Sequence, residues 1–98
     1  MRQQKCGQII NISSIFGKQP AGGMIDYNVT KAAVISLTKT LAYELAKGDV
    51  LVNAVCPGPV RTPSWENAAK MINLEHPDGM IEGFAQANIP LSRFGRPE

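Results

Sequence analysis

Apolar residues form two short runs that are rich in β-branched side chains. The first, residues 7–14 (GQIINISS), starts at a glycine and ends in hydroxyls, and the second, residues 50–57 (VLVNAVCP), is closed by a proline. Apolar runs of this length between turn-forming residues predict buried strands. Residues 15–24, which follow the first run, contain three glycines and a proline and therefore indicate a loop.

A longer periodic segment separates the two runs. From Asp26 to Lys47 no glycine or proline interrupts the chain, and four apolar residues recur at a spacing of four: Ala33, Leu37, Leu41 and Leu45. This spacing predicts a helix with one buried stripe. Asp26 is the expected N-cap, and Lys47 with Gly48 is the expected C-terminal stop.

The order strand, helix, strand predicts one βαβ unit with a right-handed crossover. Both runs are apolar at successive positions, which is typical of a parallel sheet that is covered on both faces. Beyond Pro59 the pattern predicts an amphipathic helix over 64–75, a turn at 76–79, a short helix over 80–88 and a loop to the end.

Two parallel strands leave both sheet edges open, and the predicted helices are too few to cover the faces. We therefore expect the chain to be the middle of a larger α/β domain. The predicted fold class is a partial Rossmann-type, doubly wound parallel sheet, consisting of one βαβ unit followed by further helices.

Composition excludes several functional classes. The 98 residues are 44% hydrophobic and 18% charged with a net charge of +2, which fits a globular protein and gives no basic surface for nucleic acid. No apolar run approaches the roughly 20 residues that span a bilayer, and the polar start MRQQKCGQ lacks the core of a signal peptide. Cys6 and Cys56 belong to no metal or redox motif, so we expect two small hydrophobic thiols in a cytoplasmic protein.

Tyr27 and Lys31 stand four residues apart at the head of the predicted helix. Residues at this spacing share a helix face, so their side chains can converge. A neighbouring ammonium stabilises the phenolate form of a tyrosine, and acid–base catalysis is most effective when the group titrates near the working pH. The pair therefore makes sense as a tuned proton donor, although an exposed helix face is the simpler interpretation of these two residues alone.

Ser14 lies at the carboxyl end of the first predicted strand, the edge at which ligands bind in open α/β sheets. A hydroxyl at this edge can donate to a substrate carbonyl oxygen while Tyr27 protonates it. Ser13 is the alternative hydroxyl, because strand alternation points the two serines to opposite faces. The competing interpretation of Ser14 is a hydroxyl that satisfies nearby backbone groups.

Residues 57–62 (PGPVRT) follow the second predicted strand and combine two prolines with a glycine. Such a segment holds its backbone rigidly and allows a ligand to approach closely, although an ordinary strand-to-loop turn has the same composition.

Taken together, NISS, YNVTKAAV, LVNAVCPGPVRTP and PLSRFGRPE resemble the short-chain dehydrogenase/reductase family in order and spacing, over essentially the whole chain. The resemblance implies that Ser14 orients the substrate, that Tyr27 is the acid/base, and that Tyr27 also contacts the cofactor. It also implies that Lys31 tunes the tyrosine and binds the nicotinamide ribose.

The same resemblance implies that the cofactor, NAD or NADP, lies along the segment that contains Pro57, Gly58, Val60 and Thr62. The backbone at Val60 and the hydroxyl of Thr62 are the expected contacts. The implied substrate is a small alcohol or carbonyl compound, and the implied full-length assembly is a homo-oligomer, a dimer or tetramer, without nucleic acid or membrane.

The chain departs from the family pattern in what it lacks. The Gly-rich dinucleotide turn, the upstream asparagine of the proton relay and the last strand have no counterpart, so residues 1–98 are expected to form a partial domain. The residue that selects NAD or NADP follows a strand outside the chain, and this choice stays open. The parent is then expected to be an active oxidoreductase and the isolated chain inactive, with a non-catalytic interaction module as the alternative.

Two further residues have competing interpretations. Trp65 stands where the family's substrate-covering flap begins, and either lines the pocket or anchors the flap helix. His76 has no partner at metal-binding spacing and is expected to be a solvated loop residue.

Overall fold

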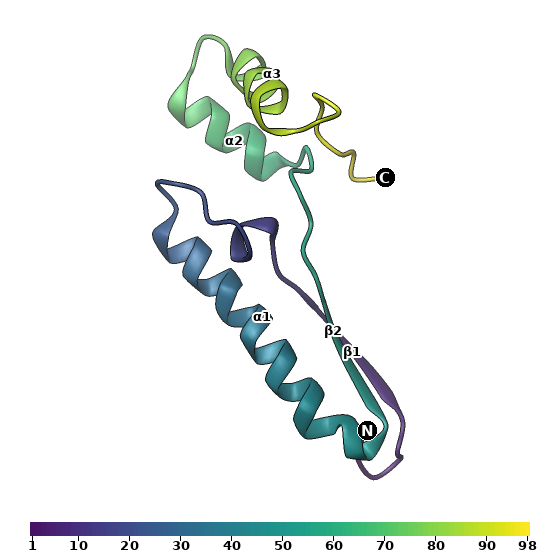
Figure 1. Cartoon of the computed structure of the whole chain (residues 1–98). Coiled ribbons are helices and arrows are strands. Elements are labelled where there is room, and N and C mark those ends of the chain that lie inside the picture. Colours follow the sequence, from purple (N-terminus) through teal and green to yellow (C-terminus); the bar gives the residue numbers. More distant parts are fainter. The chain divides into compact units, whose positions relative to one another are not determined.

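The computed structural model describes all 98 residues, which divide into two compact units (Figure 1). Unit 1 is Met1–Pro57 and unit 2 is Gly58–Glu98. No helix in either unit is both long enough and apolar enough to cross a membrane. The two units are described in turn.

Unit 1 is the predicted βαβ arrangement. Strand β1 (Gly7–Ile12) is followed by the short 3₁₀ helix η1 (Ile15–Gly17), then by helix α1 (Ile25–Leu45). A second 3₁₀ turn, η2 (Ala46–Gly48), leads into strand β2 (Val50–Val55). The strands pair in parallel, from Gly7 opposite Val50 to Ile12 opposite Val55, which confirms the predicted pairing of two parallel strands.

Helix α1 runs along the two-stranded sheet (Figure 1) and covers one of its faces. Val50 and Val52 point to that face and are 2% and 7% exposed. Their neighbours on the other face are open, and the large exposed side chains there are Ile10, Ile12, Leu51 and Val55. The apolar character of both faces is thus as predicted, but within this chain only one of them is covered.

The predicted buried stripe of α1 is partly wrong. Ala33 and Leu37 are exposed, whereas Thr38 is 5% exposed and Leu41 and Leu45 are half-buried. The physical reason is that a step of four residues turns 400°, so a row at constant spacing of four drifts around the helix. The face that packs on the sheet alternates steps of four and three.

The ends of α1 also differ from expectation. Met24 precedes the helix and makes no side-chain cap, while Asp26 lies inside the first turn. Its carboxylate accepts a hydrogen bond from the Tyr27 N–H at 2.9 Å, a favourable position for a negative charge near the positive end of the helix. At the other end the helix stops two residues earlier than predicted, and Asp49, with φ 53°, turns the chain into β2.

Unit 2 contains two helices, α2 (Pro63–Ile72) and α3 (Pro77–Asn88). The helix predicted over 64–75 is confirmed but ends three residues earlier, at Ile72. The turn predicted at 76–79 is wrong, because the helix predicted over 80–88 already begins at Pro77 and His76 precedes it. Proline is favoured at the first helical position because its missing N–H would lack a partner there anyway, so the same residue signals a turn and a helix start.

The core of unit 2 is apolar and partly aromatic. Ala69, Ile81, Ala85 and Phe94 are buried. Trp65 packs against Phe94 with ring centres 5.0 Å apart, and against Phe84 at 5.2 Å. The predicted C-terminal loop is therefore anchored to the helix pair by Phe94.

Candidate active site

Ser14 lies two residues beyond the end of β1 and is 7% exposed. It is the N-cap of η1, and its Oγ accepts a hydrogen bond from the Phe16 N–H at 3.2 Å. A hydroxyl that accepts one hydrogen bond still has its own proton to donate. Ser14 thus satisfies a local backbone group and keeps a free donor.

Ser13 points elsewhere and has a different partner. It is 4% exposed, and its Oγ donates to the main-chain carbonyl of Lys31 at 2.7 Å. Its own N–H donates to the Val55 carbonyl at 2.8 Å and so extends the ladder between the strands. The hydroxyl proton of Ser13 is already donated to the Lys31 carbonyl, so Ser14 is the serine with a proton to donate.

Tyr27 and Lys31 lie one turn apart on α1, and their side chains converge as the spacing predicts. The Lys31 Nζ is 5.7 Å from the centre of the Tyr27 ring, within range of a cation–π interaction. The Tyr27 side chain remains 40% exposed, and its ring meets Phe16 edge to face at 6.4 Å. Phe16 belongs to η1, the element that Ser14 caps, so one aromatic contact links Tyr27 to the turn that carries Ser14.

Lys31 is also held at its charged end. Its Nζ donates to the carbonyl of Ile12, the last residue of β1, at 3.3 Å. An ammonium has three N–H donors, so this contact leaves two for other partners. The lysine is therefore held by one hydrogen bond and can still bind a ligand.

The loop between Ser14 and Tyr27 is tied to the segment that follows β2 and to α1. The Ile15 N–H donates to the Pro57 carbonyl at 3.1 Å, and the side chain of Asn28 donates to the Ala21 carbonyl at 2.7 Å. The Asn28 Oδ1 is buried without a hydrogen-bond partner. Sequence patterns gave no signal for these contacts, since they join residues that are not regularly spaced.

The remaining predicted cofactor residues, Gly58, Val60 and Thr62, belong to unit 2. Val60 forms a parallel bridge with Gly95, through the Arg61 N–H to the Gly95 carbonyl at 2.9 Å and the Gly95 N–H to the Pro59 carbonyl at 3.0 Å. These bonds use the residues on either side of Val60, so its own main-chain groups are free.

The surroundings of Gly58 and the side chain of Thr62 are also uncommitted, although the Thr62 carbonyl accepts a hydrogen bond from the Glu66 N–H at 3.1 Å. A Cβ built on Gly58 would meet no other atom within 4 Å, so the packing of this chain does not require a glycine there. Thr62 precedes α2 but makes no side-chain cap hydrogen bond. Its hydroxyl is available to a ligand.

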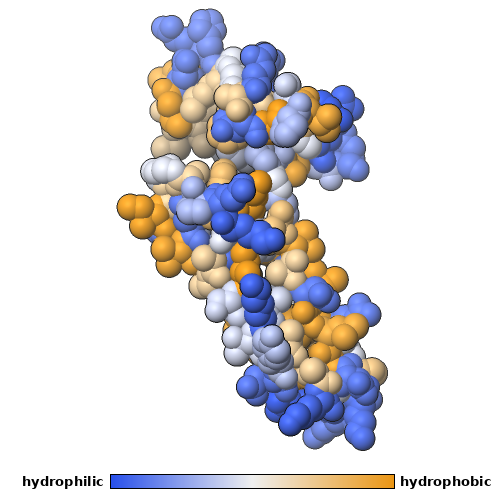
Figure 2. Space-filling view, in the orientation of Figure 1, coloured by the Kyte–Doolittle hydropathy of each residue, from blue (hydrophilic) through white to orange (hydrophobic).

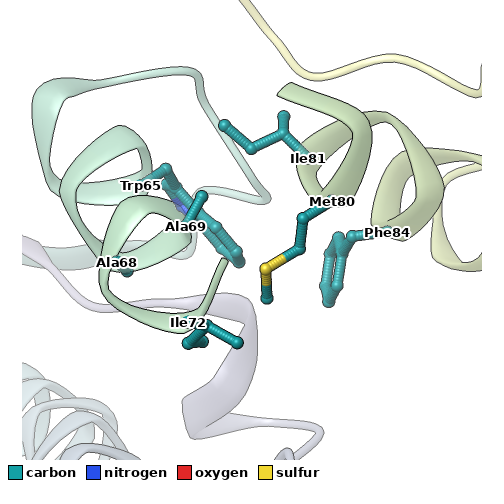
Figure 3. Close-up of a pocket in the computed structure, with 7 residues that line it drawn as sticks. All are labelled: Trp65, Ala68, Ala69, Ile72, Met80, Ile81 and Phe84. Atoms are coloured by element: carbon teal, nitrogen blue, oxygen red, sulfur yellow. The ribbon is translucent and has the colours of Figure 1, made fainter. Parts of the chain in front are cut away.

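An apolar cavity of about 60 Å³, partly open to solvent, lies between helices α2 and α3 (Figure 3). The side chains that line it are Trp65, Ala68, Ala69, Ile72, Met80, Ile81 and Phe84. Small-molecule sites are typically about 300–1,000 Å³, so this cavity is a gap in helix packing rather than a substrate site. Trp65 packs against Phe84 and Phe94 and so anchors α2, as one of its two interpretations predicts. The cavity that it also lines is not a substrate site, so the other interpretation stays a prediction.

The other candidates lie apart from this chemistry. His76 precedes α3, and no group of three His, Cys, Asp or Glu side chains is placed to hold a metal ion. Cys6 and Cys56 are free thiols. Cys6 is exposed, which corrects the expectation of a small hydrophobe, because the polar segment that carries it lies on the surface.

Comparison with known proteins identifies the family and the fold of the chain. The chain matches the short chain dehydrogenase family over residues 1–73. It is 44% identical to oxidoreductase UcpA of Escherichia coli over 98 residues, which are 99% of this chain and 37% of that protein. It thus spans little more than a third of that relative's length.

Solved structures extend the likeness to the fold. L-sorbose reductase from Gluconobacter frateurii, solved with NADPH and L-sorbose, matches with a TM-score of 0.92 at 38% identity, over 100% of this chain and 38% of that one. An NAD⁺-bound xylitol dehydrogenase matches with a TM-score of 0.86 at 28% identity, over 98% and 40% of the two chains. The α/β, partial Rossmann-type class is confirmed, and the chain belongs to the short-chain dehydrogenase family.

Proposed function

We propose that the complete protein containing this chain is an NAD(P)-dependent oxidoreductase that interconverts an alcohol and a ketone or aldehyde, with Ser14, Tyr27 and Lys31 as its catalytic residues. The observation that carries the proposal is the placement of an ammonium beside a half-exposed phenol, next to the turn that Ser14 caps. Known relatives that bind NADPH or NAD⁺ share this part of the fold.

In the direction of reduction, a nicotinamide cofactor, when bound, would supply the hydride that the carbonyl carbon receives. Ser14 donates its free O–H to the carbonyl oxygen and holds it in place. Tyr27 gives its phenolic proton to the same oxygen, which completes the alcohol. Lys31, whose Nζ lies 5.7 Å from the centre of the Tyr27 ring, provides the positive charge beside the phenolate that remains.

Each unit, taken by itself, has free groups of the kinds that such a cofactor would bind. Lys31 has two unused N–H donors for ribose hydroxyls, and Val60 has free main-chain groups for a carboxamide. Gly58 leaves room for close approach, and Thr62 keeps its hydroxyl. Pro57, whose carbonyl is used by Ile15, contributes rigidity to the same segment. Whether the cofactor is NAD or NADP is decided by residues outside the chain.

The first test is Tyr27→Phe in the complete protein. Loss of a positioned proton donor lowers turnover by about 10²- to 10⁴-fold. Binding of the reduced cofactor, followed by nicotinamide fluorescence, stays within about twofold, because removing one neutral hydroxyl changes a binding free energy by at most a modest amount.

Tyr43→Phe is the matched control, since Tyr43 lies on the same helix and is 86% exposed. It should leave both quantities unchanged. Full turnover in the Tyr27→Phe variant would refute the proposed chemistry. A parallel loss of cofactor binding would instead assign the hydroxyl a structural role.

We further propose that residues 1–98 by themselves form a partial domain without dehydrogenase activity, because the groups that hold the adenosine and diphosphate are not among them. Titration of the chain with NADH and with NADPH should give no saturable quenching of Trp65, the single tryptophan. Saturable quenching in a chain with a folded circular dichroism spectrum would contradict this.

A second candidate for the chain alone is a non-catalytic interaction module, and the outward face of α1 favours it. Ile25 and Val29 are 80% and 63% exposed, and Leu37 is 54% exposed. Figure 2 shows apolar surface over the N-terminal end of α1. If this face pairs with another copy, Val29→Lys should reduce the sedimentation coefficient, whereas Lys39→Ala on the same helix should not.

A further inference from the structure

The side chain of Ser13 connects the end of β1 to the main chain of α1 at Lys31. Its buried hydroxyl donates to the Lys31 carbonyl at 2.7 Å, across 18 positions of sequence. A hydroxyl-to-carbonyl distance of this size is typical of a well-formed O–H···O bond. The bond fixes the position of Lys31 on α1 relative to the end of β1.

A second bond runs between the same two elements in the opposite direction. The Lys31 Nζ donates to the carbonyl of Ile12, the residue before Ser13, at 3.3 Å. The main chain and the side-chain end of Lys31 are thus held by two neighbouring residues, the last residue of β1 and the one that follows it. Together the two bonds leave the ammonium little freedom to move along the strand.

Gly17 makes a third contact with the same peptide group. A Cβ at this position would lie 2.8 Å from both the carbonyl carbon and the oxygen of Lys31, and 3.0 Å from the Ile35 side chain. The Gly17 N–H also donates to the Ser14 carbonyl at 3.0 Å. Any side chain here would push η1, with Ser14 on it, away from the helix that carries Tyr27.

We infer that Ser13 and Gly17 are positioning residues that clamp the Lys31 peptide group from two sides and so set the geometry between Lys31, Tyr27 and Ser14. Neither residue touches the reacting atoms. Ser13 acts through a hydrogen bond and Gly17 through the absence of a side chain. The inference rests on the proposed function, because it assigns these residues a role in placing its catalytic groups.

The test is a double-mutant cycle in the complete protein, measured on the dissociation constant of NADH or NADPH, whichever saturates the wild type. Ser13→Ala removes one oxygen atom and should weaken binding and lower kcat by up to about tenfold each. In the Lys31→Met background the same substitution should have no further effect on binding, because residues that act as one unit are not additive.

Gly17→Ala should cost more, about 10²-fold in kcat, since displacement of a catalytic group by an ångström has an effect of that size. If this variant does not fold, Ser13→Ala still decides the question. The matched control is Thr38→Val. Thr38 is buried and accepts a bond from the β1 residue Asn11 at 3.0 Å, but it lies two turns further along the helix. The Thr38→Val substitution should lower the melting temperature and leave kcat and cofactor binding unchanged.

The outcomes separate the inference from the function on which it rests. Unchanged turnover and binding in Lys31→Met would refute the proposed function. A damaged Lys31→Met variant with an additive Ser13→Ala effect would refute the inference alone. So would a Ser13→Ala variant that, like Thr38→Val, loses stability and nothing else.

Discussion

Unit 1 buries three hydroxyl side chains, Ser13, Ser14 and Thr38, whereas every buried side chain of unit 2 is apolar. The hydroxyls of unit 1 each have a specific partner on another residue, at distances between 2.7 and 3.2 Å. The core of unit 2 consists instead of alanine, isoleucine and aromatic side chains in mutual contact.

This difference has a physical meaning. Hydrogen bonds require a defined distance and angle, so buried hydroxyls fix how far one element is shifted along another. Apolar contacts are nearly non-directional and allow a core to repack. The buried hydrogen bonds of unit 1 therefore fix the position of α1 relative to the strands. The apolar core of unit 2 holds α2 and α3 together. Substitutions at the hydrogen-bonded residues next to Lys31 should therefore affect activity, whereas substitutions in the core of unit 2 should affect stability.

The largest effect is expected for Lys31→Met in the complete protein. It removes the charge beside Tyr27 and the donors proposed for the ribose, so kcat should fall by about 10²- to 10⁴-fold. Cofactor affinity should fall by about 10- to 100-fold, the worth of a hydrogen bond from a charged group. Steady-state kinetics and a cofactor titration measure the two effects separately.

Lys39→Met is the matched control for this prediction, because Lys39 is an exposed lysine on the same helix. It should leave both quantities unchanged. Loss of affinity in Lys31→Met with full turnover would mean that the lysine binds the cofactor without tuning the tyrosine.

The next effect concerns stability in unit 2. Phe94 is 7% exposed and contacts Trp65 and Phe84, so Phe94→Ala should lower the free energy of unfolding by about 3–5 kcal/mol. Chemical denaturation followed by Trp65 fluorescence reports this unit, since the chain has one tryptophan. Both tyrosines, Tyr27 and Tyr43, lie in unit 1 and provide a separate signal.

Leu91→Ala is the control, because Leu91 stands three residues away in the same segment and is 74% exposed. Its effect should be small. Equal destabilisation by the two variants would mean that the segment as a whole, rather than the Phe94 ring, supports the helices.

The comparison of the two units also explains what the sequence could predict. The sequence predicts the ends of the strands and helices to within a few residues, because runs of β-branched residues and the Gly and Pro residues between elements are local signals. The convergence of Tyr27 and Lys31 follows from helical spacing alone. Element boundaries and the spacing within one helix depend only on residues close together in the sequence, so sequence patterns can predict them.

The failures concern information that is not local. The stripe through Ala33 and Leu37 was misassigned because α1 has apolar residues on more than one face, and only the sheet decides which face is buried. The partner of Ser13 is 18 residues away, and nothing in the loop distinguishes Gly17 from Gly22. Such contacts depend on the packed structure.

A moderate effect is expected from a buried hydroxyl of unit 1 that lies outside the proposed site. Thr38 accepts a hydrogen bond from Asn11 and donates to the Val34 carbonyl at 2.7 Å. Thr38→Val leaves the Asn11 amide without its partner and should reduce the free energy of unfolding by about 1–3 kcal/mol. Thr40→Val is its control, since Thr40 makes a similar bond to the Ser36 carbonyl but is exposed.

Denaturation followed by tyrosine fluorescence measures this loss. The double variant Asn11→Leu/Thr38→Val should recover part of the stability, because it removes both polar partners instead of leaving one buried and unpaired. No recovery would show that the shape of the pair, and not its hydrogen bond, stabilises unit 1.

The smallest effect is expected at the ion pairs on the surface of unit 2. Arg61 contacts Glu66 at 3.2 Å and Asp78 at 2.6 Å, and so joins the first turns of α2 and α3. The hydrogen bond to Glu66, followed by that to Asp78, raises the pKa of Arg61 above its usual value. Because folding raises the pKa of Arg61, the stability that its ion pairs contribute is fully present at any pH below the usual arginine pKa and is lost only in strong base. Arg61 therefore stays charged at every practical pH.

Salt, rather than pH, should therefore reveal the pairs. Arg61→Ala should lower the melting temperature of unit 2 slightly in dilute buffer, because exposed ion pairs contribute little. The difference from wild type should vanish in 1 M salt, where the screening length is about 3 Å. Arg93→Ala, which removes an exposed arginine of the same unit, should change nothing at either salt concentration. A deficit in Arg61→Ala that persists in 1 M salt would show that the arginine stem, packed between the two helices, holds them by contact rather than by charge.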